Sequence, residues 1–122
     1  MNKIKAVELF AGIGGFRVAC DDFGINTLWA NEIDPIACTV YRKNFGNNEL
    51  CEADVNKVLN EIPNHDLLTG GFPCQPFSSA GKKKGVFDTR GTLFESIASI
   101  LEIRKPKFFI LENVKRILSM QR

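Results

Sequence analysis

Residues 5–16 read Lys-Ala-Val-Glu-Leu-Phe-Ala-Gly-Ile-Gly-Gly-Phe, an apolar run that passes directly into three closely spaced glycines. The run from Lys5 to Phe10 has the composition of a strand in a sheet. The glycines supply the bare backbone and positive φ angles of a tight turn, and the spacing after them predicts a helix from Gly14 to Phe23. A strand, a glycine turn and a helix in this order indicate the first unit of an α/β fold.

The rest of the chain repeats this alternation of short apolar runs and amphipathic stretches. Further strands are predicted at residues 27–31, 49–52, 66–69 and 107–111, and helices at 34–45, 55–62 and 92–103, with a long loop over 72–91. Five strands with intervening helices predict an open, mostly parallel α/β sheet of the Rossmann type, with helices on both faces. The strand at 107–111 is so apolar that we expect it to be buried on both faces.

The composition is that of one ordinary globular domain, since 122 residues are too few for two. Sixteen basic and fourteen acidic residues give a net charge of +2, which by itself predicts no nucleic-acid or membrane partner. No apolar run approaches the roughly 18 residues that cross a bilayer, so we expect no membrane association and a cytoplasmic location. Four cysteines without Cys-x-x-Cys spacing and one histidine predict no metal site. That histidine, His65, is expected in a surface turn.

Three carboxyl groups fall where predicted strands end, the edge at which parallel sheets bind ligands. Glu32 follows Gly12 by 20 residues, a spacing at which an acid can bind both ribose hydroxyls, or can simply favour the start of the next helix. Asp54 either binds an adenine amino group or caps the helix after it. Glu112 ends the last strand, where burial would raise its pKa and make it a proton donor, unless it is hydrogen-bonded to nearby backbone. Arg17 replaces the third glycine of the dinucleotide pattern, which argues against a dinucleotide ligand.

Cys74 lies in a loop rich in proline and glycine, directly after the fourth predicted strand. A rigid turn there would present its sulfur at the ligand edge, a setting that suits a thiolate nucleophile. Cysteine is more often a small buried hydrophobic residue. We expect that packing role of the other three: Cys20, Cys38 and Cys51.

The loop after Cys74 also carries three consecutive lysines at positions 82–84, flanked by glycines. They are either a solvated run of charge or part of a mobile lid whose ammonium groups meet phosphates. Ser78 could add a neutral phosphate contact.

Four segments of the chain, in this order, resemble the motifs of the cytosine-5 DNA methyltransferases, especially the bacterial enzymes of restriction-modification systems. They are Phe10–Phe16, Gly71–Ser78 with its Pro-Cys-Gln core, Asp88–Phe94 and Glu112–Val114. The resemblance covers nearly the whole chain. It implies a Rossmann-like methyltransferase fold that uses S-adenosylmethionine, and double-stranded DNA in which the target cytosine is flipped out of the helix.

The resemblance also implies roles for individual residues. Cys74 would be the nucleophile that adds to carbon 6 of cytosine, and Glu112 the acid that protonates ring nitrogen 3. Glu32 would hold the ribose hydroxyls and Ile33 would pack on the adenine. The residues implied to bind S-adenosylmethionine are Phe10, Gly12, Gly14, Glu32, Ile33, Asp54, Val55 and Leu93. Those implied to contact DNA are Ser78, Lys82, Lys83, Lys84 and Arg90.

The later motifs of that family and its target-recognition domain have no counterpart in these 122 residues. We therefore expect a single partial catalytic domain over residues 1–122, incomplete at the C-terminal edge of its sheet. The strand at 107–111 would then be an apolar edge, open to a second chain or to a second copy of this one. We expect this chain alone not to methylate DNA with sequence specificity.

Two other functions stay open from the residues. One is a relative that methylates cytosine in tRNA on the same scaffold. The other is a non-catalytic S-adenosylmethionine-binding half of a split methyltransferase, for which the open edge strand is the distinguishing feature. A generic oxidoreductase is a weaker candidate, because the third glycine is absent and Cys74 would have no role.

Overall fold

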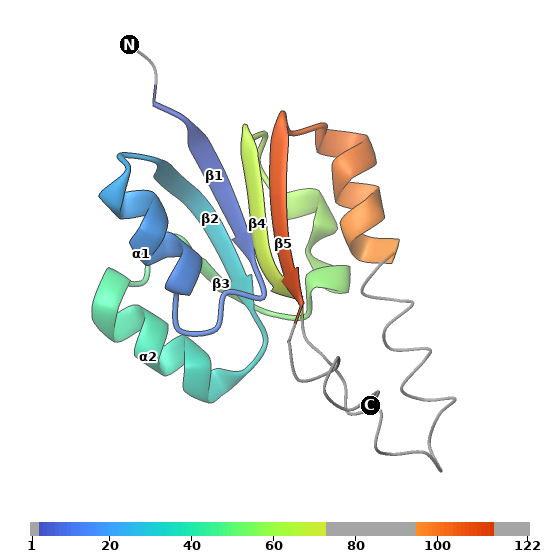
Figure 1. Ribbon diagram of the computed structural model, residues 1–122. Helices are drawn as coiled ribbons and strands as arrows, with labels where there is room; N and C mark the ends of the chain where they lie inside the picture. Colours follow the sequence, from blue (N-terminus) through green and yellow to red (C-terminus); the bar gives the residue numbers. More distant parts are fainter. Residues whose placement is uncertain (1–2, 73–94, 114–122) are drawn as a thin grey trace, which may run out of the picture.

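The computed structural model describes residues 3–72 and 95–113, which form the α/β arrangement of Figure 1. The strands are β1 (Lys5–Leu9), β2 (Asn26–Glu32), β3 (Leu50–Glu52), β4 (Leu67–Phe72) and β5 (Phe108–Asn113). The helical segments are α1 (Gly15–Asp22), α2 (Pro35–Phe45), the 3-10 turns η1 (Val55–Lys57) and η2 (Leu59–Glu61), and a helix over residues 95–104. Within these residues no helix combines the length and the hydropathy that crossing a membrane requires.

All neighbouring strands pair in parallel, in the order β3-β2-β1-β4-β5. The chain moves outward from β1 through β2 to β3 and then returns to place β4 on the other side of β1. Open α/β sheets bind their ligands at the carboxyl ends of the strands where this reversal occurs. The predicted Rossmann-like sheet is confirmed, and its switch point lies between β1 and β4.

Helical segments cover both faces of the sheet, as predicted. Figure 1 shows α1 and α2 on one face, and the η1–η2 segment with the helix over 95–104 on the other. Side chains alternate along β1 accordingly: Ala6 packs with Cys20 of α1, whereas Val7 and Leu9 face the other layer. The core of that second layer consists of Val7, Leu9, Val55, Ile62, Leu68, Ile97 and Ile100.

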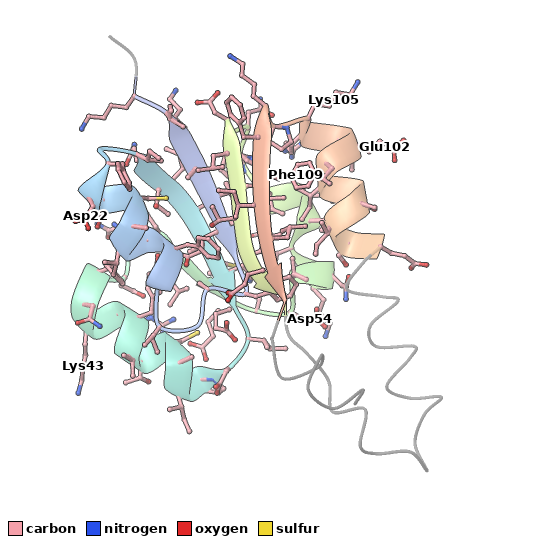
Figure 2. The ribbon with its side chains drawn as sticks, viewed as in Figure 1. Asp22, Lys43, Asp54, Glu102, Lys105 and Phe109 are labelled. Atoms are coloured by element: carbon pink, nitrogen blue, oxygen red, sulfur yellow. The ribbon has the colours of Figure 1, made fainter. Side chains whose placement is uncertain are left out.

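The last strand, β5, is an edge strand with exposed apolar side chains, so the prediction that residues 107–111 are buried on both faces is wrong. Phe108, Phe109 and Ile110 are 60%, 56% and 52% exposed, and Figure 2 labels Phe109 on this strand. The reason is that, among the described strands, β5 pairs with β4 alone. Apolar composition predicts burial, but it does not distinguish a central strand from an edge whose cover comes from elsewhere.

The single helix predicted over residues 55–62 is instead the pair of 3-10 turns. Asp54 caps the first of them, because its Oδ1 accepts a hydrogen bond from the amide of Asn56 at 3.0 Å. Val58, with a φ of −125°, interrupts the helical backbone between the two turns. The apolar spacing is helical, but the backbone makes only single turns.

His65 is buried at 7% exposure, which corrects its predicted place in a surface turn. Its Nδ1 lies 2.7 Å from the carbonyl oxygen of Pro63, and its Nε2 has no partner among the described residues. Burial lowers the pKa of His65 from its ordinary value of 6.5, and the charge of Arg104 acts in the same direction.

We expect the His65→Gln variant to remove part of the pH dependence of stability. The unfolded chain takes up a proton near pH 6.5 whereas the buried ring resists it, so this stabilisation is present above that pH and lost below it. Urea unfolding of both proteins on either side of that pH measures the effect. A difference in the free energy of unfolding that is the same at both pH values would contradict the expectation.

Candidate active site

The glycine turn after β1 has a left-handed backbone conformation. Gly12 and Gly14 have φ angles of 59° and 96°, and Phe10 also has a positive φ of 51°. A bulky side chain in this region carries about 1–3 kcal/mol of strain, which persists only where neighbouring groups enforce it. The amide of Ala11 donates to the carbonyl of Asn31 at 3.0 Å, which joins the turn to β2. The strain therefore lies at the switch point, where ligands of such sheets bind.

The two left-handed glycines meet different surroundings. Beside Gly12 the space that a Cβ would occupy is open, so a ligand can approach its backbone closely. Beside Gly14 the space is filled, since a Cβ there would lie 2.3 Å from Cε2 of Phe45 at the end of α2. Gly14 is needed for the packing of the turn against α2 as well as for its φ angle.

Glu32, at the end of β2, binds three backbone amides with its two carboxylate oxygens. Oε1 accepts a hydrogen bond from Gly12 at 2.7 Å, and Oε2 accepts from Ile33 and Asp34 at 3.1 and 2.9 Å. The first of these bonds joins the end of β2 to the glycine turn. A carboxylate offers about four acceptor positions, so one stays available for a further donor such as a ribose hydroxyl.

Apolar side chains at the same edge are uncovered. Ile33, the residue predicted to pack on an adenine, is 61% exposed directly beside Glu32. Ile13, within the glycine turn, is exposed to a similar degree. Exposed apolar surface next to a hydrogen-bonding carboxylate suits a ligand that has both a flat apolar part and hydroxyl groups.

The two residues predicted to border the adenine differ in what they can offer. Asp54 is half-buried at the carboxyl edge of the sheet, where Figure 2 labels it. Its side chain accepts a hydrogen bond from the amide of Asn56, so Asp54 caps the turn that follows it, which is one of its two predicted roles. Val55 is buried in the core cluster, so little of its side chain is left for a ligand.

The ends of β4 and β5 bring Glu112 beside the glycine turn. Gly71 pairs with Glu112, and Phe72 with Asn113. Oε1 of Glu112 and the carbonyl oxygen of Phe10 lie 3.6 and 4.0 Å from the point that a Cβ on Gly71 would occupy. Two of the motifs singled out in the sequence are therefore neighbours in space, separated only by the bare backbone of Gly71.

Glu112 is exposed, which differs from the burial expected for an acid at the end of this strand. The cause is the edge position of β5, which has a neighbour on one side only within residues 3–72 and 95–113. Glu112 therefore lies at the site, but within the described residues it lacks the burial that was expected to raise its pKa.

The other predicted site residues lie outside the described residues: Cys74, Ser78, Lys82, Lys83, Lys84, Arg90 and Leu93. Cys74 follows the last residue of β4, Phe72, by two positions. Because the end of β4 pairs with the end of β5, the chain leaves the sheet beside Glu112 shortly before Cys74.

The cysteines that the structure describes have the properties of packing residues. Cys20 and Cys38 are buried and Cys51 is half-buried. Burial raises the pKa of all three thiols, that of Cys38 to about 11, which disfavours the reactive thiolate. The packing role predicted for Cys20 and Cys38 is confirmed. Within residues 3–72 and 95–113 no group of His, Cys, Asp or Glu side chains is arranged to hold a metal ion.

Two residues near the turn were missed in the sequence. Glu8 is buried within β1, although the only available signal was an acid inside an apolar run. Arg17 joins α1 to α2: its guanidinium donates to Tyr41 and Glu49 at 3.2 and 3.0 Å and lies 4.9 Å from the ring centre of Phe45. The residue that replaces the third glycine thus fixes the helix that follows the turn.

The parallel sheet, its strand order, the glycine turn after β1 and the acid at the end of β2 define a Rossmann-like α/β domain with a ligand site at the carboxyl edge. The model of the family described as C-5 cytosine-specific DNA methylase matches residues 4–122. The chain belongs to this family.

Individual relatives agree with this assignment. The Type II methyltransferase M.HaeII of Haemophilus aegyptius is 49% identical over 118 residues, which are 96% of this chain and 36% of that protein. The Type II methyltransferase M.HhaI of Haemophilus parahaemolyticus is 48% identical over 120 residues, 98% of this chain and 36% of that protein. The crystal structure of S. pombe Dnmt2 methyltransferase has a TM-score of 0.73 at 28% identity, covering 93% of this chain and 37% of that one. The chain spans about a third of the length of these relatives.

We expect Gly14→Ala to lower the free energy of unfolding by about 2–4 kcal/mol, and Gly12→Ala by about 1–2 kcal/mol. Both variants force an L side chain into a left-handed backbone, but only the methyl group at Gly14 also displaces Phe45. Urea unfolding measures both values. Gly24→Ala is the control for backbone strain alone, since Gly24 has a φ of 71° and open space around it. Equal losses at Gly14 and Gly24 would refute the packing role of Gly14.

Proposed function

We propose that this chain is the cofactor-binding and nucleophile-bearing part of a DNA cytosine-5 methyltransferase of a bacterial restriction-modification system. The observation that carries the proposal is the pairing of Gly71 with Glu112 beside Phe10. Because of this pairing, the glycine turn, the acid of the last strand and the end of β4, two residues before Cys74, lie at the same edge of the sheet. Family membership supports the same reaction.

The described residues fit S-adenosylmethionine as the methyl donor. Glu32 has an acceptor position left for the ribose hydroxyls, and exposed Ile33 offers an apolar surface to the adenine. The open space beside Gly12 admits the rest of the ligand close to the backbone. The sulfonium group of the bound cofactor supplies an activated methyl group. Phe10, Gly14, Asp54, Val55 and Leu93 complete the proposed cofactor set.

Cys74 acts as the nucleophile on the target base. Its thiolate forms a carbon–sulfur bond at carbon 6 of cytosine, and the electron pair of the 5,6 double bond becomes available at carbon 5. Carbon 5 takes the methyl group, and the carbon 5 proton is then removed by a base. The carbon–sulfur bond breaks, the double bond forms again and the thiolate of Cys74 leaves unchanged.

Glu112 assists the addition by donating a proton to ring nitrogen 3, which makes carbon 6 more electrophilic, and it takes this proton back when the carbon–sulfur bond breaks. Carbon 5 and carbon 6 are not accessible inside a duplex, so the cytosine must be flipped into the site. Ser78, Lys82, Lys83, Lys84 and Arg90 are the proposed contacts to the DNA backbone. The protein is proposed to act in the cytoplasm of a bacterium.

DNA is favoured over tRNA by the relatives themselves. Two relatives that are 48–49% identical to the chain are named Type II methyltransferases. A non-catalytic half of a split enzyme would need neither the Pro-Cys-Gln segment nor the acid of the last strand.

A chimera tests the proposed chemistry, because this chain spans only a part of its relatives. In the chimera, this chain replaces the matching third of M.HaeII from Haemophilus aegyptius. DNA that carries 5-fluorocytosine cannot lose the carbon 5 substituent, so we expect a covalent protein–DNA complex on a denaturing gel. Cys74→Ala should abolish the complex, and Glu112→Gln should slow its formation by about 100-fold while S-adenosylmethionine affinity stays nearly unchanged.

Cys51→Ala is the matched control, since it removes a half-buried thiol on β3 and should leave the covalent complex intact. Persistence of the complex in Cys74→Ala would overturn the assignment of the nucleophile. Failure of the unsubstituted chimera to trap either DNA or tRNA, while it still binds S-adenosylmethionine, would favour the non-catalytic alternative.

The edge of β5 is proposed to be covered in the working protein by further strands, from the same chain or from a second copy. We therefore expect the 122-residue chain to self-associate, and Ile110→Lys to shift it toward the monomer, because a charge on this edge opposes strand pairing. Sedimentation velocity over a range of concentrations measures the shift. Phe23→Lys, at a residue that is also exposed but lies after α1, should have no such effect. A wild-type chain that is monomeric throughout would count against an open edge.

A further inference from the structure

Glu8 is a buried carboxyl group without a hydrogen-bond partner in the described part of the chain. It lies in β1, two residues before the glycine turn begins at Phe10, and it is 2% exposed. Neither of its carboxyl oxygens accepts a hydrogen bond of normal geometry from residues 3–72 or 95–113. Burying such a group without a partner costs free energy. An apolar residue would be expected here unless the carboxyl group has a function.

Glu8 lies on the face of β1 that α1 covers, since Ala6, two residues before it in the strand, packs with Cys20 of α1. The backbone amides of Phe16 and Arg17 favour its charged form. α1 begins after Gly14 with no side-chain cap and has no acid in its first turn. The acid that acts electrostatically on the start of this helix is therefore Glu8 of the neighbouring strand, and not a residue of the helix itself.

The charged and titratable groups around Glu8 come from both helices on that face of the sheet. Arg17 favours its charged form and Asp21 disfavours it. Cys20 of α1 and Tyr41 of α2 also interact electrostatically with it. Burial outweighs the favourable groups and raises the pKa of Glu8 from 4.5 to about 7. Both the acid and the carboxylate are therefore populated near neutral pH.

Thr69 adds a second polar group at the same level of the sheet. It is the residue of β4 that pairs with Glu8, and its buried hydroxyl also lacks a partner among the described residues. Glu8 thus has uncharged neighbours on the sheet and a single nearby cation, Arg17, in the described layer above. Positive charge added at the glycine turn would shift this balance toward the carboxylate.

We propose that Glu8 is a positioning residue beneath the cofactor turn and that it gives up its proton when S-adenosylmethionine, which carries a net positive charge, binds above it. The inference rests on the proposed function, because it takes this cofactor as the ligand of the turn. The O–H bond of Glu8 breaks, its electron pair stays on the carboxylate, and the proton passes to the buffer. The new carboxylate strengthens its attraction for the amides of Phe16 and Arg17 and so holds the turn in place.

Binding and proton release are linked, so the affinity must rise with pH. If Glu8 is neutral in the free protein below its pKa and fully charged in the complex, the affinity rises by about tenfold between pH 6 and pH 8. The same group also affects stability without a ligand. Because its pKa is raised in the folded chain, its stabilisation is complete below pH 4.5 and is lost as the pH rises through about 7.

Titration calorimetry of the 122-residue chain with S-adenosylmethionine tests the proposal. Binding is measured at pH 6, 7 and 8, in two buffers with different heats of ionisation, for the wild type, Glu8→Gln and Glu49→Gln. We expect proton release at pH 7 and the tenfold rise in affinity for the wild type, and neither for Glu8→Gln after any titration of the ligand itself is subtracted. Glu49→Gln removes a partner of Arg17 but keeps Glu8, so it should retain both effects.

A role of Glu8 in folding alone would change stability but would not release a proton on binding. The buffer dependence is measured in the wild type, so the test does not depend on whether Glu8→Gln folds. Binding with no proton release, or with the same release in Glu8→Gln, would overturn this inference and leave the proposed function intact. Absence of S-adenosylmethionine binding at every pH would overturn both.

Discussion

The hydrogen bond from the amide of Gly12 to the carboxylate of Glu32, at 2.7 Å, is the contact on which the site depends. A glycine turn leaves backbone amides without partners inside the fold, and such amides must be satisfied. Glu32, on the neighbouring strand, accepts a hydrogen bond from one amide of the turn. It also accepts from the amides of Ile33 and Asp34, directly before α2. One side chain therefore sets the position of the turn relative to β2 and the start of the next helix. A ligand that meets this edge finds its shape already formed, which reduces the entropy lost on binding.

The other side of the turn is fixed by packing. Phe45 occupies the space beside Gly14, and the guanidinium of Arg17 lies over the same ring. The hydrogen bonds of Arg17 to Tyr41 and Glu49 extend this contact into α2 and the segment after it. The positive φ of Phe10 is maintained because the turn is held from both sides. Strain of this kind is a feature of the turn itself and needs no ligand to enforce it.

The order of the strands and helices, and the position of Glu32 at the end of a strand, could be predicted from the sequence. Both depend on local patterns: the alternation of apolar runs and the spacing of the glycines. Burial could not be predicted in this way, because it depends on neighbours that are distant in the sequence. The composition of β5 predicts burial on both faces, that of the segment around His65 predicts a surface turn, and the place of Glu112 predicts burial. All three expectations are wrong for that reason, whereas the edge position predicted for β5 agrees with the strand order. Glu8 was missed because one acid in a strand pattern does not reveal which face it occupies. The roles of Cys74 and the lysines of its loop stay predictions.

Three glutamates near one edge of the sheet show how the surroundings decide the use of a single residue type. Glu32 accepts hydrogen bonds from three backbone amides, so its carboxylate is held in place with one acceptor position left. Glu112 is exposed at the end of β5, beside Gly71, and is the residue proposed to donate a proton to the substrate. Glu8 is buried without a hydrogen-bond partner among residues 3–72 and 95–113, and burial raises its pKa to about 7, so its charge is sensitive to its surroundings. The three carboxyl groups therefore differ in their surroundings: one is held by backbone amides, one is exposed at the end of β5 and one is buried within β1. These differences follow from position in the sheet, since each lies on a different strand.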